Sequence, residues 1–178
     1  LGPLRIDVGI FHLNNGDNIA EAEEAADTAR KNAEKSHLNT YTFYSEAIRS
    51  RQYAEATLLY QLEEALDNNK LTIHLQPKVR TRDGKIAGAE ALVRWQHPKN
   101  GFISPAVFIP LCEENGLIRQ LDLFVFEQVC KCLAEWQHKG LPLLPISVNV
   151  SRQHFKNPHF LDDYQAILQR WHIPPEKI

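Results

Sequence analysis

The stretch Gly88-Ala89-Glu90-Ala91-Leu92-Val93-Arg94-Trp95 is the part of the sequence that decides the fold. Successive side chains of a strand point to opposite sides, so Glu90, Leu92 and Arg94 share one side and the small apolar residues share the other. The carboxylate could hold a hard divalent cation, and the guanidinium could grip a phosphate with two parallel hydrogen bonds. The alternative is a simple Glu–Arg pair at the end of a strand.

On either side of this stretch, strands and helices alternate. Thr81-Arg82-Asp83-Gly84 is a hairpin signal between strands 71–79 and 86–95, which predicts an antiparallel pair. Downstream, Ser104 and Pro105 begin a predicted helix 105–115 that Gly116 ends. The remaining elements predicted after it are a helix over 118–139, a buried strand over 145–150 and a helix over 158–171.

This alternation favours an α/β sheet or barrel. An eight-stranded barrel typically needs about 250 residues, and the chain has 178. We therefore expect part of a (β/α) barrel of the TIM type, with an antiparallel first strand.

The first part of the sequence predicts a separate α+β unit. Strands are expected at 4–13 and 39–44, around a helix over 19–35 that has one face of alanines, and a long amphipathic helix over 45–67 follows. Asn68-Asn69 stops that helix. We divide the chain into residues 1–45, a connecting helix 46–69 and residues 70–178. A start within a strand and the absence of Met favour a segment of a longer protein.

Two amides are further candidates for a site. Asn149 lies in the apolar run Ile146-Ser147-Val148-Asn149-Val150, and burying an amide without a partner costs roughly 1–3 kcal/mol. It therefore needs a fixed partner, which could be a metal, a ligand or simply neighbouring backbone. The same alternatives hold for Gln76, which precedes Pro77 in the first strand of the hairpin.

Composition excludes several classes of protein. The formal net charge of -2 gives no basic field for DNA, RNA or an anionic membrane surface, so any phosphate binding must be local. No apolar run reaches the roughly 18–20 residues that span a bilayer. Three cysteines without a CxxC pair favour a reducing compartment, and we expect a cytoplasmic protein. The histidines show no metal-ligand spacing, and no phosphate loop or nucleophile elbow is found.

Four blocks of the sequence together resemble consecutive blocks of the EAL family, whose members hydrolyse the bacterial second messenger cyclic di-GMP. They are His74-Leu75-Gln76-Pro77-Lys78-Val79, residues 84–95, residues 108–118 and Ser147-Val148-Asn149-Val150-Ser151. Residues 8–10, 26–29 and 39–44 resemble the end of a GGDEF domain, the diguanylate cyclase fold. Arg30-Lys31 and Ser36-His37 depart from that second pattern.

The resemblance to the EAL family implies a role for six residues. Glu90 and Asn149 match metal ligands, Glu90 being the catalytic carboxylate, and Arg94 matches a phosphate contact. Gln76 matches a nucleotide contact, Leu92 a residue near the ligand, and Asp122 a contact to guanine. The implied reaction is hydrolysis to linear pGpG with two Mg²⁺ or Mn²⁺ ions. Further acidic ligands and a catalytic Lys of the family have no match here, so we expect these residues alone to be inactive.

Three hypotheses remain open at this point. The parent protein is a GGDEF–EAL phosphodiesterase, or a non-catalytic receptor for cyclic di-GMP, or an assembly module whose open strand edges must be covered. The family also implies a homodimer through the EAL part or the connecting helix. A sensory or membrane domain would lie outside these residues.

Overall fold

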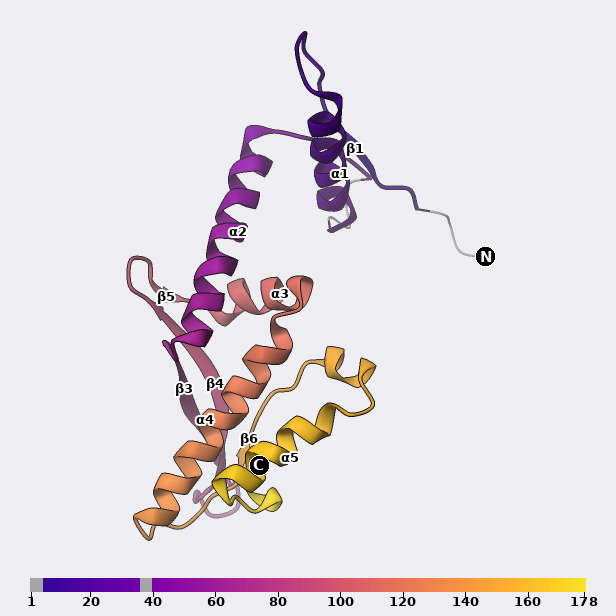
Figure 1. Ribbon diagram of the computed structural model, residues 1–178. Coiled ribbons are helices and arrows are strands. Elements are labelled where there is room, and N and C mark those ends of the chain that lie inside the picture. Colours follow the sequence, from indigo (N-terminus) through magenta and orange to yellow (C-terminus); the bar gives the residue numbers. More distant parts are fainter. Residues whose placement is uncertain (1–4, 36–39) are drawn as a thin grey trace. The chain divides into compact units, whose positions relative to one another are not determined.

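A computed structural model describes residues 5–35 and 40–178 (Figure 1). The chain forms two compact units, Leu1–Thr57 and Leu58–Ile178. The predicted strand start at Leu4, the Ser36-His37 turn and Asn39 lie outside the described residues.

The first unit contains two short parallel strands and a helix between them in sequence. β1 (Val8–Ile10) pairs with β2 (Tyr41–Phe43), and α1 (Ile19–Lys35) connects them as predicted. Both strands are shorter than expected because backbone pairing spans only three residues of each. Aromatic and β-branched composition favours a strand, but a neighbouring strand must also be present over its length.

The alanine face of α1 packs closely on β1, as the sequence indicates. Ala22, Ala29 and Ala33 are buried. A Cβ atom on Gly9 would lie 1.8 Å from the carbonyl oxygen of Ala26, far inside contact distance. Only glycine allows the strand and helix backbones to approach this closely.

The second unit is built on a four-stranded sheet in which β4 (Ile86–His97) is central. β3 (Leu71–Val79) runs antiparallel along one edge of β4, which confirms the predicted hairpin. On the other edge, β5 (Gly101–Ile103) is antiparallel at the end of β4 and β6 (Ile146–Ser147) is parallel near its start. β5 was not predicted from the sequence, since three residues carry too little periodicity.

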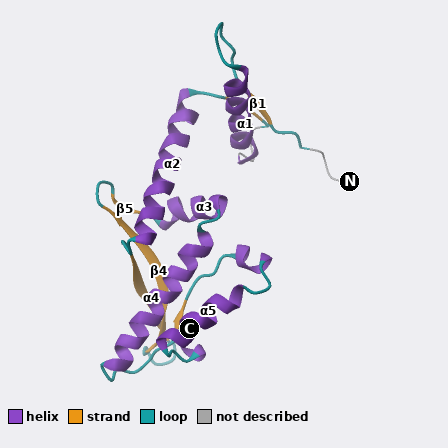
Figure 2. Ribbon diagram, viewed as in Figure 1, coloured by secondary structure: helices purple, strands orange, loops and turns teal. Residues whose placement is uncertain are grey.

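Helices cover one side of this sheet (Figure 2). The long α2 (Glu46–Asp67) precedes the sheet and α3 (Pro105–Asn115) follows β5. Next come α4 (Ile118–His138), the 3₁₀ helix η1 (Arg152–Lys156), α5 (Phe160–Trp171) and a second 3₁₀ turn η2 (Pro175–Lys177). Figure 1 shows α4 along the sheet with α5 packed beside it. None of the helices in the described parts of the chain has the length and apolarity to cross a membrane.

The cap residues of α3 are those that the sequence predicts. Ser104 Oγ accepts a hydrogen bond from the Ala106 N–H at 3.4 Å, and Gly116 adopts the left-handed conformation with φ 78°. The predicted helix over 158–171 begins two residues late, at Phe160, because 152–156 form a 3₁₀ helix before it.

The core lies between the sheet and these helices. Alternate residues of β4 are buried on this side, and Trp95 packs edge-to-face against Phe108 of α3 with ring centroids 5.7 Å apart. Leu62 from α2 and Leu121 from α4 are fully or almost fully buried in the same cluster. Glu90, Leu92 and Arg94 are half-buried on the alternate positions, which confirms the predicted division of the strand.

Candidate functional site

Glu90 lies in the middle of the sheet, with a polar residue opposite it on both neighbouring strands. Gln76 of β3 pairs with it on one side and Ser147 of β6 on the other. The sheet thus brings the two predicted residues Gln76 and Glu90 into one row, and Gln76 itself is exposed. Side chains opposite each other in such a row lie within reach of one ligand.

The predicted position of Asn149 within a buried strand is wrong. β6 ends at Ser147, where its parallel pairing with β4 stops, and Asn149 lies exposed in the segment beyond it. Because Asn149 is exposed, no desolvation cost demands a partner. It nevertheless has one: its Nδ2 donates a hydrogen bond to Glu90 Oε1 at 3.0 Å. The two expected metal ligands are therefore adjacent.

Lys78 brings a positive charge to Ser147, at one end of this row, and was not predicted from the sequence. Its Nζ donates to Ser147 Oγ at 2.6 Å, and Ser147 Oγ lies 3.4 Å from the Ala89 carbonyl oxygen. The alternation of side chains along a strand could have predicted it, because Lys78 is two residues from Gln76 and therefore lies on the same side of β3.

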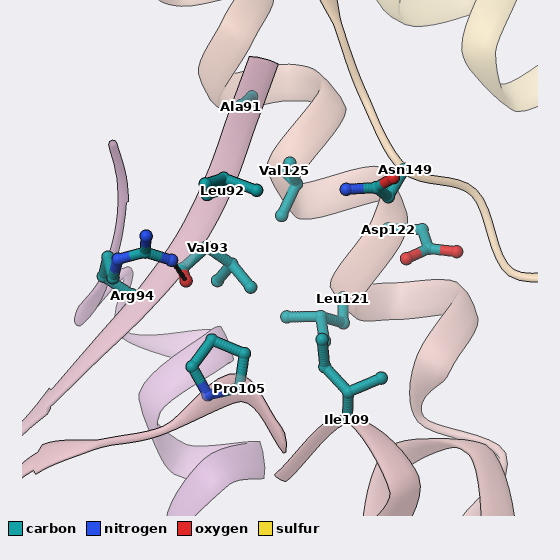
Figure 3. A pocket seen from close by; sticks show the side chains of 10 residues that line it. All are labelled: Ala91, Leu92, Val93, Arg94, Pro105, Ile109, Leu121, Asp122, Val125 and Asn149. Carbon is teal, nitrogen blue, oxygen red and sulfur yellow. Dashed lines mark hydrogen bonds between the residues drawn. The ribbon is translucent and has the colours of Figure 1, made fainter. Parts of the chain in front are cut away.

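A cleft of about 90 Å³ lies beside this row, along residues 91–94 of β4. It occupies the edge of β4 between its pairings with β5 and β6, where no described strand adds to the sheet. Its lining is Ala91, Leu92, Val93, Arg94, Pro105, Ile109, Leu121, Asp122, Val125 and Asn149 (Figure 3).

Four of the six predicted residues therefore line one cleft. Asn149 and Asp122 are drawn near each other, across the cleft from β4, which carries Leu92 and Arg94 (Figure 3). Glu90 is joined to them through its hydrogen bond with Asn149. Gln76 is on the next strand and does not line the cleft.

Arg94 does not form the simple pair with Glu90 that the sequence left as an alternative. Its Nη1 donates to the Val93 carbonyl oxygen at 2.9 Å. The ion pairs found among residues 5–35 and 40–178 include none between Arg94 and Glu90. Its guanidinium therefore retains donors for an anionic ligand, because the group carries five N–H bonds.

Asp122, on the second turn of α4, is held from the segment after β6. Its Oδ2 accepts from the Ser151 N–H at 2.8 Å and lies 2.9 Å from His154 Nε2. Burial raises the pKa of the Asp122 carboxyl, and these two hydrogen bonds oppose that rise. His154, which no sequence pattern singled out, is buried and hydrogen-bonded.

The residues at Glu90 have the ligand atoms that a hard divalent cation prefers, but they are too few to form a complete site. A carboxylate and an amide oxygen are the ligands that Mg²⁺ and Mn²⁺ prefer. Within residues 5–35 and 40–178, no three His, Cys, Asp or Glu side chains lie close enough to hold a metal ion. Glu90 and Asn149 can thus supply one part of such a site.

Comparison with known proteins shows the family to which the chain belongs. The EAL domain family matches residues 60–178. The chain is 33% identical over 172 residues to the bifunctional diguanylate cyclase/cyclic di-GMP phosphodiesterase MucR of Pseudomonas aeruginosa, and 32% identical over 174 residues to the oxygen sensor protein DosP of Escherichia coli. Each match covers 96% of this chain, but only 25% of MucR and 21% of DosP.

Solved structures that resemble this chain are also EAL proteins. The MucR phosphodiesterase in complex with c-di-GMP is 37% identical with a TM-score of 0.62, over 67% of this chain and 48% of that one. The FimX EAL domain of Pseudomonas aeruginosa bound to c-di-GMP is 28% identical with a TM-score of 0.56, over 65% of this chain and 46% of that one. The family match alone covers more than half of the sequence, and the chain belongs to the EAL domain family.

Proposed function

We propose that the protein carrying this chain hydrolyses cyclic di-GMP to linear pGpG in its EAL domain. The observation that carries the proposal is the 3.0 Å contact between Asn149 Nδ2 and Glu90 Oε1 beside the cleft that holds Arg94 and Asp122. MucR, a relative at 33% identity, is named for this activity. The cleft, the Glu90 carboxylate and the Arg94 guanidinium together suit a phosphodiester ligand.

Each residue of the site has a distinct part in this proposal. Arg94 grips a phosphate through its remaining N–H donors, and Asp122 accepts hydrogen bonds from a guanine base. Gln76 contacts the nucleotide from the neighbouring strand. Leu92 supplies an apolar wall between Glu90 and Arg94. Polar groups fix the orientation of the ligand while apolar surface contributes burial.

Glu90 and Asn149 would hold Mg²⁺ or Mn²⁺ through their side-chain oxygens. A cation at this position supplies Lewis acidity and lowers the pKa of bound water toward neutrality. A two-metal site needs more negative charge than one carboxylate, so we propose that its other ligands lie outside these 178 residues. For the same reason we propose that the chain alone binds weakly and does not turn over.

The domain organisation is also a proposal. We assign residues 70–178 to the first part of an EAL (β/α) barrel, 46–69 to a connecting helix and 1–45 to the end of a GGDEF-like domain. The match to the bifunctional MucR over 96% of the chain supports it. The family match begins at residue 60, within the connecting helix, ten residues before the assigned boundary.

Titration calorimetry of the whole protein with cyclic di-GMP, with and without Mg²⁺, tests the function. Chromatography of the reaction mixture follows linear pGpG. We expect binding, and hydrolysis that chelation of the cation abolishes and Mg²⁺ or Mn²⁺ restores. Failure of the protein to bind cyclic di-GMP under either condition would refute the proposal.

A non-catalytic receptor is the second candidate. The FimX EAL domain, a structural relative at 28% identity, was solved with c-di-GMP bound, which is the ligand that such a receptor would take. The presence of both Glu90 and Asn149 favours the enzyme instead. Binding without any pGpG in the presence of Mg²⁺ and Mn²⁺ would select this function over hydrolysis.

A further inference from the structure

His154 is a buried histidine whose polar contacts lead to the ligand cleft. The residue is only 4% exposed, at the centre of η1. Its Nε2 lies 2.9 Å from Asp122 Oδ2, and Asp122 lines the cleft. When the Asp122 carboxyl is ionised it only accepts hydrogen bonds, so in that state Nε2 bears the N–H that donates a hydrogen bond to Oδ2.

One oxygen of Asp122 accepts hydrogen bonds from two groups in the segment after β6. The Ser151 N–H also donates to Asp122 Oδ2, at 2.8 Å. Neither Ser151 nor His154 lines the cleft. Both hydrogen bonds that Asp122 accepts from the described residues end on Oδ2, and none ends on Oδ1. The two donors hold Oδ2, which leaves Oδ1 as the oxygen available to a ligand.

The histidine is itself fixed by its surroundings. The Tyr164 hydroxyl lies 3.4 Å from His154 Nε2, and the two rings pack with centroids 5.7 Å apart. Phe160 makes a second aromatic contact with His154, with centroids 6.1 Å apart. A donor that is packed between other side chains holds its acceptor in one orientation, which is how supporting residues give a binding site its precision.

We propose that His154 is a positioning residue for base selection: it holds Asp122 so that Oδ1 accepts a hydrogen bond from guanine. The inference rests on the proposed function and deepens it. The Watson–Crick edge of guanine presents two adjacent N–H donors, whereas adenine presents an acceptor at the equivalent ring nitrogen. A fixed carboxylate therefore attracts guanine and repels adenine, and a mobile one discriminates less. Sites built around a fixed polar group reject the wrong ligand by leaving that group unpaired.

Selectivity between cyclic di-GMP and cyclic di-AMP tests the role of His154 in the whole protein. In His154→Leu, which lacks the donor, we expect KM and Kd for cyclic di-GMP to rise about tenfold, the effect of losing one hydrogen bond to a charged group. The preference over cyclic di-AMP should fall by a similar factor. We expect kcat to change by less than about threefold, because Glu90 and Asn149 are untouched.

Two further variants separate positioning from packing. His154→Gln keeps an N–H donor of similar reach and should restore most of the selectivity. His154→Phe repeats the loss with a second apolar side chain, in case the leucine variant does not fold. Combined with Asp122→Asn, His154→Leu should cost little more selectivity than Asp122→Asn alone, since both changes remove one interaction.

His97 provides a matched control, because it is also a buried histidine, 6% exposed. Its Nε2 lies 3.2 Å from Gln61 Oε1, and it does not line the cleft. His97→Leu should lower Tm without changing base preference. Unchanged selectivity in the folded donorless variants, or an equal loss in His97→Leu, would overturn the positioning role. A wild-type protein that ignores both dinucleotides would instead overturn the proposed function.

Discussion

Glu90 is the residue on which the proposed chemistry depends most directly. Its carboxylate is half-buried between Gln76 and Ser147 and contacts Asn149. We expect Glu90→Ala to lower kcat by more than the roughly 10–100-fold that partners of metal ligands contribute, while binding of cyclic di-GMP partly survives through the cleft. Steady-state kinetics with Mg²⁺ and calorimetry measure the two effects.

Glu63→Ala is a suitable control for this variant, since Glu63 is an exposed carboxylate of α2. Turnover by Glu90→Ala at a rate near that of the wild type would show that Glu90 is not a metal ligand.

The cysteines give a second prediction at the residue scale. Burial raises the pKa of both the Cys112 and the Cys130 thiol to about 12. Only the thiolate reacts with alkylating reagents, so both residues should resist iodoacetamide at about pH 8 until the protein unfolds. Cys132 is partly exposed and its pKa is raised less markedly, so it should be modified first. Mass spectrometry of the alkylated peptides identifies the order, and early labelling of Cys112 would contradict the packing described.

Most of the site follows from the sequence, although by two different routes. The two-residue period of β4 places Glu90 and Arg94 on one side, and the structure confirms this. The resemblance to the EAL family also identified Asn149 as a site residue. The separate argument that Asn149 lies buried in a strand and needs a partner was wrong, because Asn149 is exposed. The contact between His154 and Asp122 spans 32 positions in the chain, and no local pattern predicts such a pair.

At the scale of elements, β4 comes very close to the residue before β6. A Cβ atom on Gly88 would lie 2.5 Å from the Pro145 carbonyl oxygen, which accepts a hydrogen bond from Ala89 N–H at 3.0 Å. We expect Gly88→Ala to destabilise the second unit by about 1–3 kcal/mol, because the backbone must shift to accept the methyl group. Thermal unfolding measures the change.

Ala87→Ser is the neighbouring control, since Ala87 is exposed. Its Tm should stay close to that of the wild type. A Gly88→Ala protein as stable as the wild type would show that β6 can move away without cost.

Helices were predicted more closely than strands, for a physical reason. Capping residues and hydrophobic periodicity are local, so the bounds of α1 and α3 agree with the sequence. Strand ends depend on a partner that lies far along the chain. β5 and the early end of β6 are therefore set by contacts with β4, which the local sequence does not encode.

At the scale of the molecule, the two compact units should respond separately to mutation. A Cβ atom on Gly9 would lie 1.8 Å from Ala26 O and 2.4 Å from Arg30 N, both backbone atoms of α1. We expect Gly9→Ala to loosen β1 and α1, and hydrogen exchange there should accelerate by at least about tenfold. Peptides from β4 and α4 should exchange as in the wild type. Faster exchange throughout both units would mean that they unfold together.

The segment that follows β6 has a consequence for how ligands would bind. Asn149 contacts Glu90, and only two residues later the Ser151 N–H holds Asp122. A cation that orders Asn149 would therefore also order the nearby residues that hold Asp122. The entropy cost of ordering this side of the cleft would then be smaller when the dinucleotide binds. On this basis the cation and the dinucleotide should bind cooperatively, each raising the affinity for the other by the same factor, as thermodynamic linkage requires.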